Sequence, residues 1–457
     1  MIIIIEFSLL RKRLKITPTQ LVVASFATLI VVGTLLLNLP AASRNGQSVG
    51  LINAFFTATS AVCVTGLVVV DTGTHWTVFG QVLIVALIQI GGLGIMTMST
   101  LIALLLGRKI TLRERLLIQE SLNQFDLEGL VRLTKNIIIA TFTIELIGAI
   151  LFSTVFVPDY GLKKGIAFGV FHAITAFCNA GFDLVGEFRS FTPYVNNYII
   201  NINTMALIVI GGLGFSVWTD IYHIFKARSF KSIALHSKVV LSTTLFLILF
   251  GAVFIFAVEF NNPGTLKNLP FSGKVLASFF HSVSPRTAGY NTLDMAALST
   301  PTKFMTIILM FIGGSPGSTA GGIKTATAAI LVLTVIAVVK GKEEPEVFER
   351  RLPNYLVYRA MAVAAISLGL VVFATMVLSL TESADFMTLF FETTSAFGTV
   401  GLTLNYSPNL SLIGKIIISI TMFAGRVGPL TLILAFAQRA SRNKGNLKYP
   451  EDRIMVG

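Results

Sequence analysis

Long apolar stretches alternate with short polar links along the whole chain. A membrane-spanning helix needs about 20 consecutive apolar residues, and eight stretches approach or exceed this length. They fall into four pairs, and each pair encloses a shorter apolar segment that could not cross a bilayer. The pattern therefore predicts eight spanning helices in four units, each with a short helix and a loop between its long helices. The eight stretches begin at Leu21, Thr77, Asn136, Asn196, Val239, Thr302, Tyr355 and Ser411.

The four short segments share one pattern and end alike. They read FFTATSAVCVTGL, VFHAITAFCNAGF, FFHSVSPRTAGY and FFETTSAFGTVGL, and their shared glycines are Gly66, Gly181, Gly289 and Gly401. These glycines lie 115, 108 and 112 residues apart, so one unit of about 110 residues occurs four times. Because each unit spans twice, all four have the same orientation. We predict an all-α integral membrane fold in which four parallel helix–pore-loop–helix repeats surround a central pore.

Composition and charge agree with this organisation. The chain is 54% hydrophobic and 12% charged, with a mean hydropathy of +0.80, which excludes an ordinary soluble protein. Of its 35 Lys and Arg residues, 24 lie at the two ends and in the three links between repeats. The positive-inside rule therefore predicts that both termini and the links are cytoplasmic and that the glycine loops face outward. Basic residues spread over five segments do not favour nucleic-acid binding. The predicted parts are a cytoplasmic N-terminal segment (1–18), repeat 1 (19–107), a linker with repeat 2 (108–225), a linker with repeat 3 (226–340), a linker with repeat 4 (341–437) and a cytoplasmic C-terminal tail (438–457).

The ends of the glycine loops are the candidate ion ligands. An ion without its water needs oxygen atoms, and consecutive carbonyls aimed at one axis can supply them. The backbone must then adopt conformations that a β-carbon disfavours, which explains a glycine in every loop. Four unrelated turn glycines are the alternative, and their common register argues against it. The predicted selectivity-filter residues are Val64, Thr65, Gly66, Asn179, Ala180, Gly181, Thr287, Ala288, Gly289, Thr399, Val400 and Gly401.

The second long stretch of repeat 3 cannot be one straight helix. It covers residues 302–339, and a helix of that length would measure about 57 Å, nearly twice the ~30 Å hydrocarbon core. Its middle holds five glycines and a proline, which do not sustain a helix. We predict a flexible loop across the path beneath the filter, acting as a gate; a plain kink is the alternative. The predicted gate residues are Gly313, Gly314, Ser315, Pro316, Gly317, Ser318, Thr319, Ala320, Gly321, Gly322, Lys324 and Arg426.

Arg426 is included because it lies mid-span in the last long stretch, where a lone charge costs about 2.5 kcal/mol or more and faces the protein interior. It could donate hydrogen bonds to the gate loop, or it could pair with Glu392. Lys324 could anchor the loop or extend to the cytoplasmic interface. The second long helices of repeats 1 and 2 contain glycine-rich strings around Gly91 and Gly211, and such strings are typical of close helix packing.

Two cysteines, Cys63 and Cys178, hold the same repeat position and preclude a disulfide framework. Without accompanying ligands, they are best interpreted as small side chains packed behind the loops. No phosphate-binding loop or HExxH motif is present in the sequence. We therefore predict that the chain is not an enzyme and has no covalently bound cofactor.

Several strings together give the chain a family resemblance. They are VTGLVVVDTGTHWTVFGQ, LIQIGGLGIMT, SPRTAGYNTLD, SAFGTVGLT and MFAGRVGPLT. With the four loop endings, they resemble the Trk/Ktr/HKT superfamily of potassium transporters, and most closely the ion-translocating membrane subunit of bacterial Ktr systems. The resemblance covers the chain from about Thr17 to the C-terminal tail.

The resemblance implies potassium uptake across the bacterial plasma membrane, with sodium dependence left open. A glycine in each filter loop accompanies potassium selectivity in the superfamily, whereas a serine in the first loop accompanies sodium transport in some plant members; here that position is Gly66. Only the fourth loop has a Thr-Val-Gly core, so we expect some passage of sodium or rubidium. The resemblance also implies an intramembrane gating loop, a homodimer with one pore in each chain, and a cytoplasmic nucleotide-binding ring subunit that holds the nucleotide. The segments Arg108–Lys135 and Lys226–Lys238 and the tail after Gln438 are its predicted docking surfaces.

Three other functions have weaker support in the sequence. A substrate-coupled secondary transporter often has inverted repeats and acidic residues near the midplane, but here the repeats are parallel and only Glu145 and Glu392 approach that position. A membrane scaffold or receptor would not need four loops in register. A sodium-carrying member of the same superfamily keeps the architecture and stays the main alternative.

Overall fold

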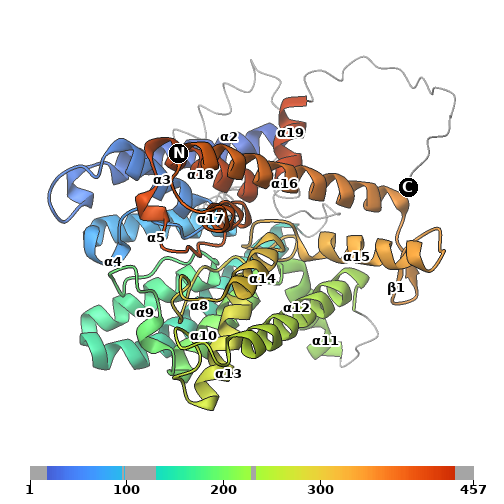
Figure 1. Cartoon of the computed structure of the whole chain (residues 1–457), viewed down its shortest axis with the longest axis horizontal. Helices are drawn as coiled ribbons and strands as arrows, with labels where there is room; N and C mark the ends of the chain where they lie inside the picture. Colours follow the sequence, from blue (N-terminus) through green and yellow to red (C-terminus); the bar gives the residue numbers. More distant parts are fainter. Residues whose placement is uncertain (1–17, 95–96, 98–129, 228–232, 438–457) are drawn as a thin grey trace.

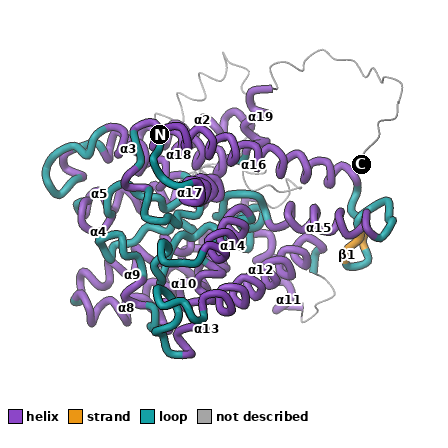
Figure 2. The backbone as a smooth tube through the Cα atoms, viewed as in Figure 1, coloured by secondary structure: helices purple, strands orange, loops and turns teal. Residues whose placement is uncertain are grey.

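The computed structural model describes residues 18–94, 97, 130–227 and 233–437, and these are predominantly helical (Figures 1 and 2). The first two groups of elements follow the chain in the same order, a long helix, a short helix and a second long helix. The first group contains α2 (Pro18–Leu37), η1 (Pro40–Ala42), α3 (Leu51–Val62), α4 (Thr72–His75) and α5 (Val78–Leu93). The second contains α8 (Leu130–Tyr160), α9 (Leu162–Phe177), η2 (Thr192–Tyr194), α10 (Tyr198–Gly212) and α11 (Phe215–Ala227).

The same order recurs in the second half of the chain. The third group contains α12 (Leu235–Glu259), α13 (Phe271–Val283), α14 (Thr300–Phe311) and α15 (Thr325–Val339). A short hairpin of β1 (Glu346–Val347) and β2 (Arg350–Arg351) follows. The fourth group contains α16 (Asn354–Thr381), α17 (Phe386–Gly398), η4 (Ser407–Asn409), α18 (Leu412–Val427) and α19 (Pro429–Ala437).

Polar side chains set where several helices begin. Thr77, Asn197 and Ser411 precede α5, α10 and α18, and each accepts a hydrogen bond from a backbone N–H of the first turn. Asp385 caps α17 in the same way through the N–H of Thr388. Such caps satisfy donors that a helix start otherwise leaves free. The second helix of three groups therefore starts where the sequence changes from polar to apolar.

Four helices of the described residues are long and apolar enough to cross a membrane: α2 from Thr19, α8 from Leu133, α12 and α16. The eight predicted spanning helices included a break in the second helix of repeat 3, and the second helices of the second and fourth groups are interrupted as well. The chain bends by 101° between α10 and α11, and residues 312–324 separate α14 from α15. The breaks after α5, α10 and α18 fall at Gly94, Gly214 and Gly428, each with a φ near 90°, which favours glycine.

The glycine-rich strings also bring helices into close contact, as predicted for the first two. A β-carbon on Gly91 would lie 2.0 Å from the carbonyl oxygen of Val62, and one on Gly211 would lie 2.0 Å from that of Phe177. Both carbonyls belong to the last residue of a short helix, so each second helix packs directly on the short helix of its own group.

The helix contacts form a closed cycle. Within each group the first long helix packs on the short helix, as in α2 with α3 and α16 with α17. The second helix of each group also packs on the short helix of the next: α5 on α9, α10 on α13, α14 on α17, and α18 on α3. The contact of α18 with α3 joins the end of the chain to its beginning. The four short helices and the loops after them are therefore enclosed by the longer helices.

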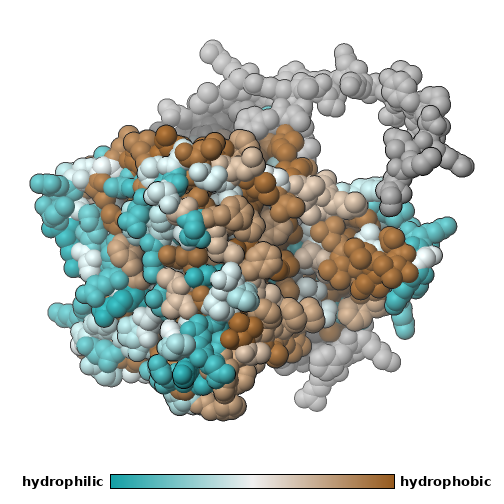
Figure 3. Space-filling model, in the orientation of Figure 1, coloured by the Kyte–Doolittle hydropathy of each residue, from teal (hydrophilic) through white to brown (hydrophobic). Residues whose placement is uncertain are grey.

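The surface is divided into polar and apolar regions. In Figure 3, hydrophilic side chains gather at the left of the view and at the right tip near the β1–β2 hairpin, and hydrophobic side chains dominate between them. Exposed Leu, Ile, Val and Phe side chains on α2, α8, α12 and α16 contribute to this apolar surface. A surface of this kind suits hydrocarbon, and it agrees with an all-α membrane protein.

Candidate functional site

The four predicted glycines lie against one another's loops in a closed order. A β-carbon on Gly66 would lie 2.4 Å from the carbonyl oxygen of Ala180, and one on Gly181 would lie 2.5 Å from that of Ala288. A β-carbon on Gly289 would lie 2.2 Å from the Val400 oxygen, and one on Gly401 would lie 2.3 Å from the Thr65 oxygen. The fourth loop therefore returns to the first, and only glycine fits at each of the four positions. We call these four loop ends the glycine ring.

The backbone of each loop alternates in handedness. The residue two places before each glycine has a positive φ: 58° at Val64, 58° at Asn179, 74° at Thr287 and 50° at Thr399. The ring glycines also have positive φ, between 66° and 95°, whereas the residues between have not. Alternation of this kind turns successive peptide groups so that their carbonyls point to the same side. A positive φ raises the conformational free energy of the β-branched residues Val64, Thr287 and Thr399. Backbone strain of this kind is concentrated at functional sites.

Hydroxyl residues of the short helices hold the loops in place. The middle loop residue donates its N–H to the backbone oxygen of Ser60, Thr175, Ser284 or Ser395, at 2.8 to 2.9 Å in the four loops. Ser60 and Ser395 also accept, through Oγ, the N–H of Gly66 and Gly401 at 3.0 and 3.1 Å. These bonds use the loop N–H groups, and within the described part of the chain no hydrogen bond is donated to the carbonyls of the twelve predicted filter residues.

A cavity of about 370 Å³ lies at the glycine end of the loops, and its lining includes all four ring glycines. Four acidic residues also line it: Asp71, Asp183, Glu187 and Asp294. Arg189 is a basic residue of the lining, and its Nε lies 3.3 Å from Glu187. The cavity is therefore a negatively charged vestibule in front of the glycine ring, and we call it the vestibule below.

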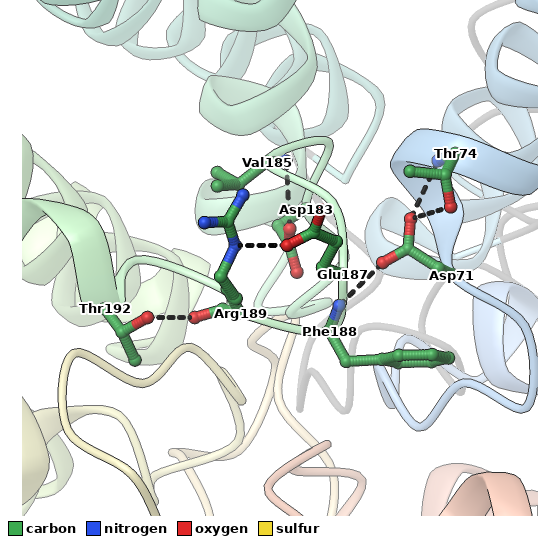
Figure 4. A network of polar contacts seen from close by, with 8 residues as sticks. All are labelled: Asp71, Thr74, Asp183, Val185, Glu187, Phe188, Arg189 and Thr192. Atoms are coloured by element: carbon green, nitrogen blue, oxygen red, sulfur yellow. Dashed lines mark hydrogen bonds and ion pairs between the residues drawn. The ribbon is translucent and has the colours of Figure 1, made fainter.

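Hydrogen bonds join the vestibule loops of the first two groups (Figure 4). The carboxylate of Asp71 accepts from the N–H and Oγ1 of Thr74, at 2.7 Å each, and from the N–H of Phe188 at 2.8 Å. Asp183 accepts the N–H of Val185 at 3.0 Å. Burial, and then the charge of Asp71, raise the pKa of Asp183 to about 7, while backbone N–H bonds oppose this rise. Asp183 therefore changes charge near neutral pH.

The predicted gate segment lies at the opposite end of the four loops. A β-carbon on Gly321 would lie 2.1 Å from Thr399 Oγ1, and one on Gly313 would lie 3.2 Å from Thr287 Cγ2. The ends of the segment are joined, because the N–H of Gly313 donates to the oxygen of Ile323 at 2.8 Å. The segment is therefore a compact loop, and it covers the loop residues most distant from the vestibule.

The second group and Arg426 hold this loop. The N–H groups of Ser315 and Thr319 donate to Gly212 and Gly211, at 2.9 and 3.3 Å. The guanidinium of Arg426 donates to the carbonyl of Thr319 and to those of Gly91 and Gly92, the last at 3.0 Å. One side chain thus connects the fourth group with the first and with the loop of the third.

Two alternatives left open by the sequence are resolved by these contacts. Glu392 accepts from Thr403 and from Ser407, the latter at 2.7 Å, and it does not pair with Arg426. Lys324 donates from Nζ to the oxygen of Ala320 at 2.6 Å, so it is tied to the loop itself. Cys63 and Cys178 are free and buried, as predicted.

The sequence did not predict two features of the site. One is that the carbonyls of Gly91 and Gly92 accept hydrogen bonds from Arg426, and the other is that helices end near Gly94, Gly214 and Gly428. Glycine near the end of an apolar stretch was the available signal for the breaks. The predicted docking segments lie largely outside the described residues, as do the N-terminal segment and the tail.

Comparison with known proteins places the chain in a family. A model described as TrkH, cation transport protein, matches residues 8–445. The chain belongs to this family. It is 43% identical over 446 residues to Ktr system potassium uptake protein B of Bacillus subtilis, covering 98% of each chain. It is 44% identical over 451 residues to potassium/sodium uptake protein NtpJ of Enterococcus hirae, covering 98% of this chain and 99% of that one.

A solved structure shares the fold. The crystal structure of the potassium transporter TrkH from Vibrio parahaemolyticus matches with a TM-score of 0.70, covering 92% of this chain and 85% of that one at 19% identity. At this identity the match supports the fold alone. The family and the apolar helices together indicate a multi-pass membrane protein.

Proposed function

We propose that this chain carries potassium ions into bacteria across the plasma membrane, through a central pore that passes along the axis of the glycine ring. The closed order of the four loops carries the proposal, because a ring of backbone oxygens around one axis can replace the water of an ion. Potassium uptake proteins among the close relatives support the choice of ion.

Each part of the site has a role in this mechanism. The acidic vestibule raises the local concentration of cations in front of the ring. The loop carbonyls, which the short-helix hydroxyl residues leave free, coordinate the dehydrated ion. Carbonyls fixed by left-handed backbone need no rearrangement when an ion enters, so one ion can replace another along the axis.

The loop at 313–324 is the gate in this proposal. It covers the inner end of the four loops, and Arg426 holds it there through hydrogen bonds from a charged donor. Movement of the loop away from Thr399 and Thr287 would open the path. Arg426 also places a positive charge beside the path while the loop is closed, which opposes cation flow.

Assembly and orientation complete the proposal. The excess of Lys and Arg at the ends and links favours cytoplasmic termini and a vestibule that faces outward. The name of the Bacillus subtilis relative, which belongs to a Ktr system, supports a partner subunit. We propose a homodimer controlled by a cytoplasmic nucleotide-binding ring, with the nucleotide on that ring and basic links as its docking surface.

A sodium carrier is the second candidate, because only the fourth loop has a Thr-Val-Gly core and the Enterococcus hirae relative is named for both ions. Potassium and sodium flux should be measured side by side in liposomes that contain the purified chain. We expect potassium flux to exceed sodium flux. Sodium flux equal to or above potassium flux would reject the potassium proposal and favour the second candidate.

A further inference from the structure

Thr399 occupies an unusual place in the glycine ring. It is 1% exposed, and its φ of 50° is costly for a β-branched residue. Its Oγ1 is buried without a hydrogen-bond partner among the described residues. A buried polar group is nearly always bonded, so an exception calls for a physical explanation. That explanation lies in what covers the side chain.

Gly321 of the gate loop covers Thr399. A β-carbon on Gly321 would lie 2.1 Å from Oγ1, 2.8 Å from Cγ2 and 3.0 Å from Cβ of Thr399. All three contacts are with this one side chain. Rotation about χ1 cannot relieve the conflict, because a threonine has a heavy atom in two of its three positions and because the Cβ itself is too close.

The backbone of Gly321 is unlike that of the neighbouring glycines. Gly317 and Gly322 have φ of 65° and 64°, in the region that favours glycine, whereas Gly321 lies outside it. An alanine at 321 would therefore be free of backbone strain of this kind. The space taken by Thr399 is what requires glycine at position 321.

We propose that Gly321 and Thr399 form the seat of the closed gate, so that the closed loop rests on the fourth filter loop. The inference rests on the proposed gate and adds the contact that sets its closed position. The contact leaves the Thr399 hydroxyl without a hydrogen-bond partner among the described residues, so it contributes shape more than binding energy. Arg426 supplies the hydrogen bonds that keep the loop on the seat. A gate built this way is released when those bonds are lost.

Two substitutions test the contact between Gly321 and Thr399: one introduces a steric clash, and the other relieves it. Gly321→Ala adds one methyl group that the seated loop cannot accommodate, which shifts the loop away from the path. We expect potassium flux through the chain alone, in liposomes, to rise about tenfold. Thr399→Gly removes all three contacting atoms and suits the left-handed φ, so the double variant G321A/T399G should return to low flux. T399G alone is the reference for the double variant, because Thr399 is itself a predicted filter residue.

Gly369→Ala is the matched control. Gly369 lies in α16, has no positive φ, and nothing lies within 4 Å of a β-carbon added there. It should leave flux unchanged. Thermal unfolding of each purified variant shows whether it is folded.

The outcomes separate the seat from the gate. Flux in folded G321A that equals or falls below the wild-type value would overturn the seat, and so would a double variant as leaky as G321A. Deletion of residues 314–321 serves as the reference. If deletion raises flux and G321A does not, the gate stands and the seat is wrong; if deletion leaves flux unchanged, the gate itself is wrong.

Discussion

Glycine is required at the four ring positions for two independent reasons. Each has a positive φ, and each has the neighbouring loop's carbonyl where a β-carbon would be. The first reason could be inferred from sequence, because four glycines in register are typical of unusual backbone. The second could not, since it depends on contacts between residues more than 100 positions apart. The same holds for Asp71, whose bond to Phe188 joins two loops that no local pattern connects.

Gly66→Ser tests the ring at one position. The added side chain would push the Ala180 carbonyl away from its place, and that loop would then coordinate the ion poorly. We expect the potassium-to-sodium permeability ratio to fall about tenfold, which corresponds to about 1.4 kcal/mol. Gly46→Ser is a suitable control, because Gly46 also has a positive φ, 67°, but nothing lies within 4 Å of its added β-carbon. An unchanged ratio in G66S would show that the ring does not set selectivity.

The raised pKa of Asp183 predicts that potassium flux depends on pH. Its pKa is raised to about 7, mainly by burial and then by the charge of Asp71, so the carboxyl is neutral below that pH and negative above it. Acidification on the vestibule side through pH 7 should remove one negative charge and reduce potassium flux about two- to threefold. Asp183→Asn should give low flux with no step in this range.

Asp159→Asn controls for the loss of a carboxylate. Asp159 bonds to Tyr194 and is absent from the vestibule lining, so the step near pH 7 should persist. A step that survives in D183N would assign the titration to another group.

At the scale of elements, the sequence predicted the short helices and the break in the second helix of repeat 3, but not the ends of the other second helices. The aromatic short segments are bounded by polar residues, and α3, α9, α13 and α17 form there. The breaks near Gly94, Gly214 and Gly428 were missed because small residues in an apolar stretch also indicate close packing. Both interpretations apply to the same strings: Gly91 and Gly211 pack against carbonyls, and the positive-φ glycines three residues later, Gly94 and Gly214, end the helices.

Arg426 links these broken ends, and Arg426→Gln should release the gate. The guanidinium donates to three carbonyls, and a hydrogen bond from a charged group contributes about 1.5–3 kcal/mol. Loss of even one such bond should raise basal potassium flux about tenfold or more. Lys415→Gln is a control from the same helix, since Lys415 bonds to Asn53 and not to the gate loop. Flux in R426Q at or below the wild-type level would contradict a holding role.

At the scale of the whole molecule, the closed cycle of helix contacts explains why four units are needed. Each short helix is enclosed by helices of its own group and of the preceding one, so no group completes its own packing. Parallel repetition, read from the spacing of Gly66, Gly181, Gly289 and Gly401, was sufficient to predict the order of elements. The pairing of α18 with α3 could only be seen in three dimensions, because it joins the last group to the first.

The same architecture predicts which side each link occupies. If the chain is inserted with its basic links inside, Lys342, in the link before α16, is cytoplasmic, and Lys267, between α12 and α13, is external. Both side chains are exposed, and the two native cysteines are buried, so single Lys→Cys variants report on topology without further substitutions. A membrane-impermeant thiol reagent added to intact cells should label K267C and not K342C. Permeabilised cells should label both, and the wild-type chain should stay unlabelled throughout. Labelling of K342C in intact cells would show the opposite orientation. The acidic vestibule would then collect ions from the cytoplasm, which is the arrangement of an exporter.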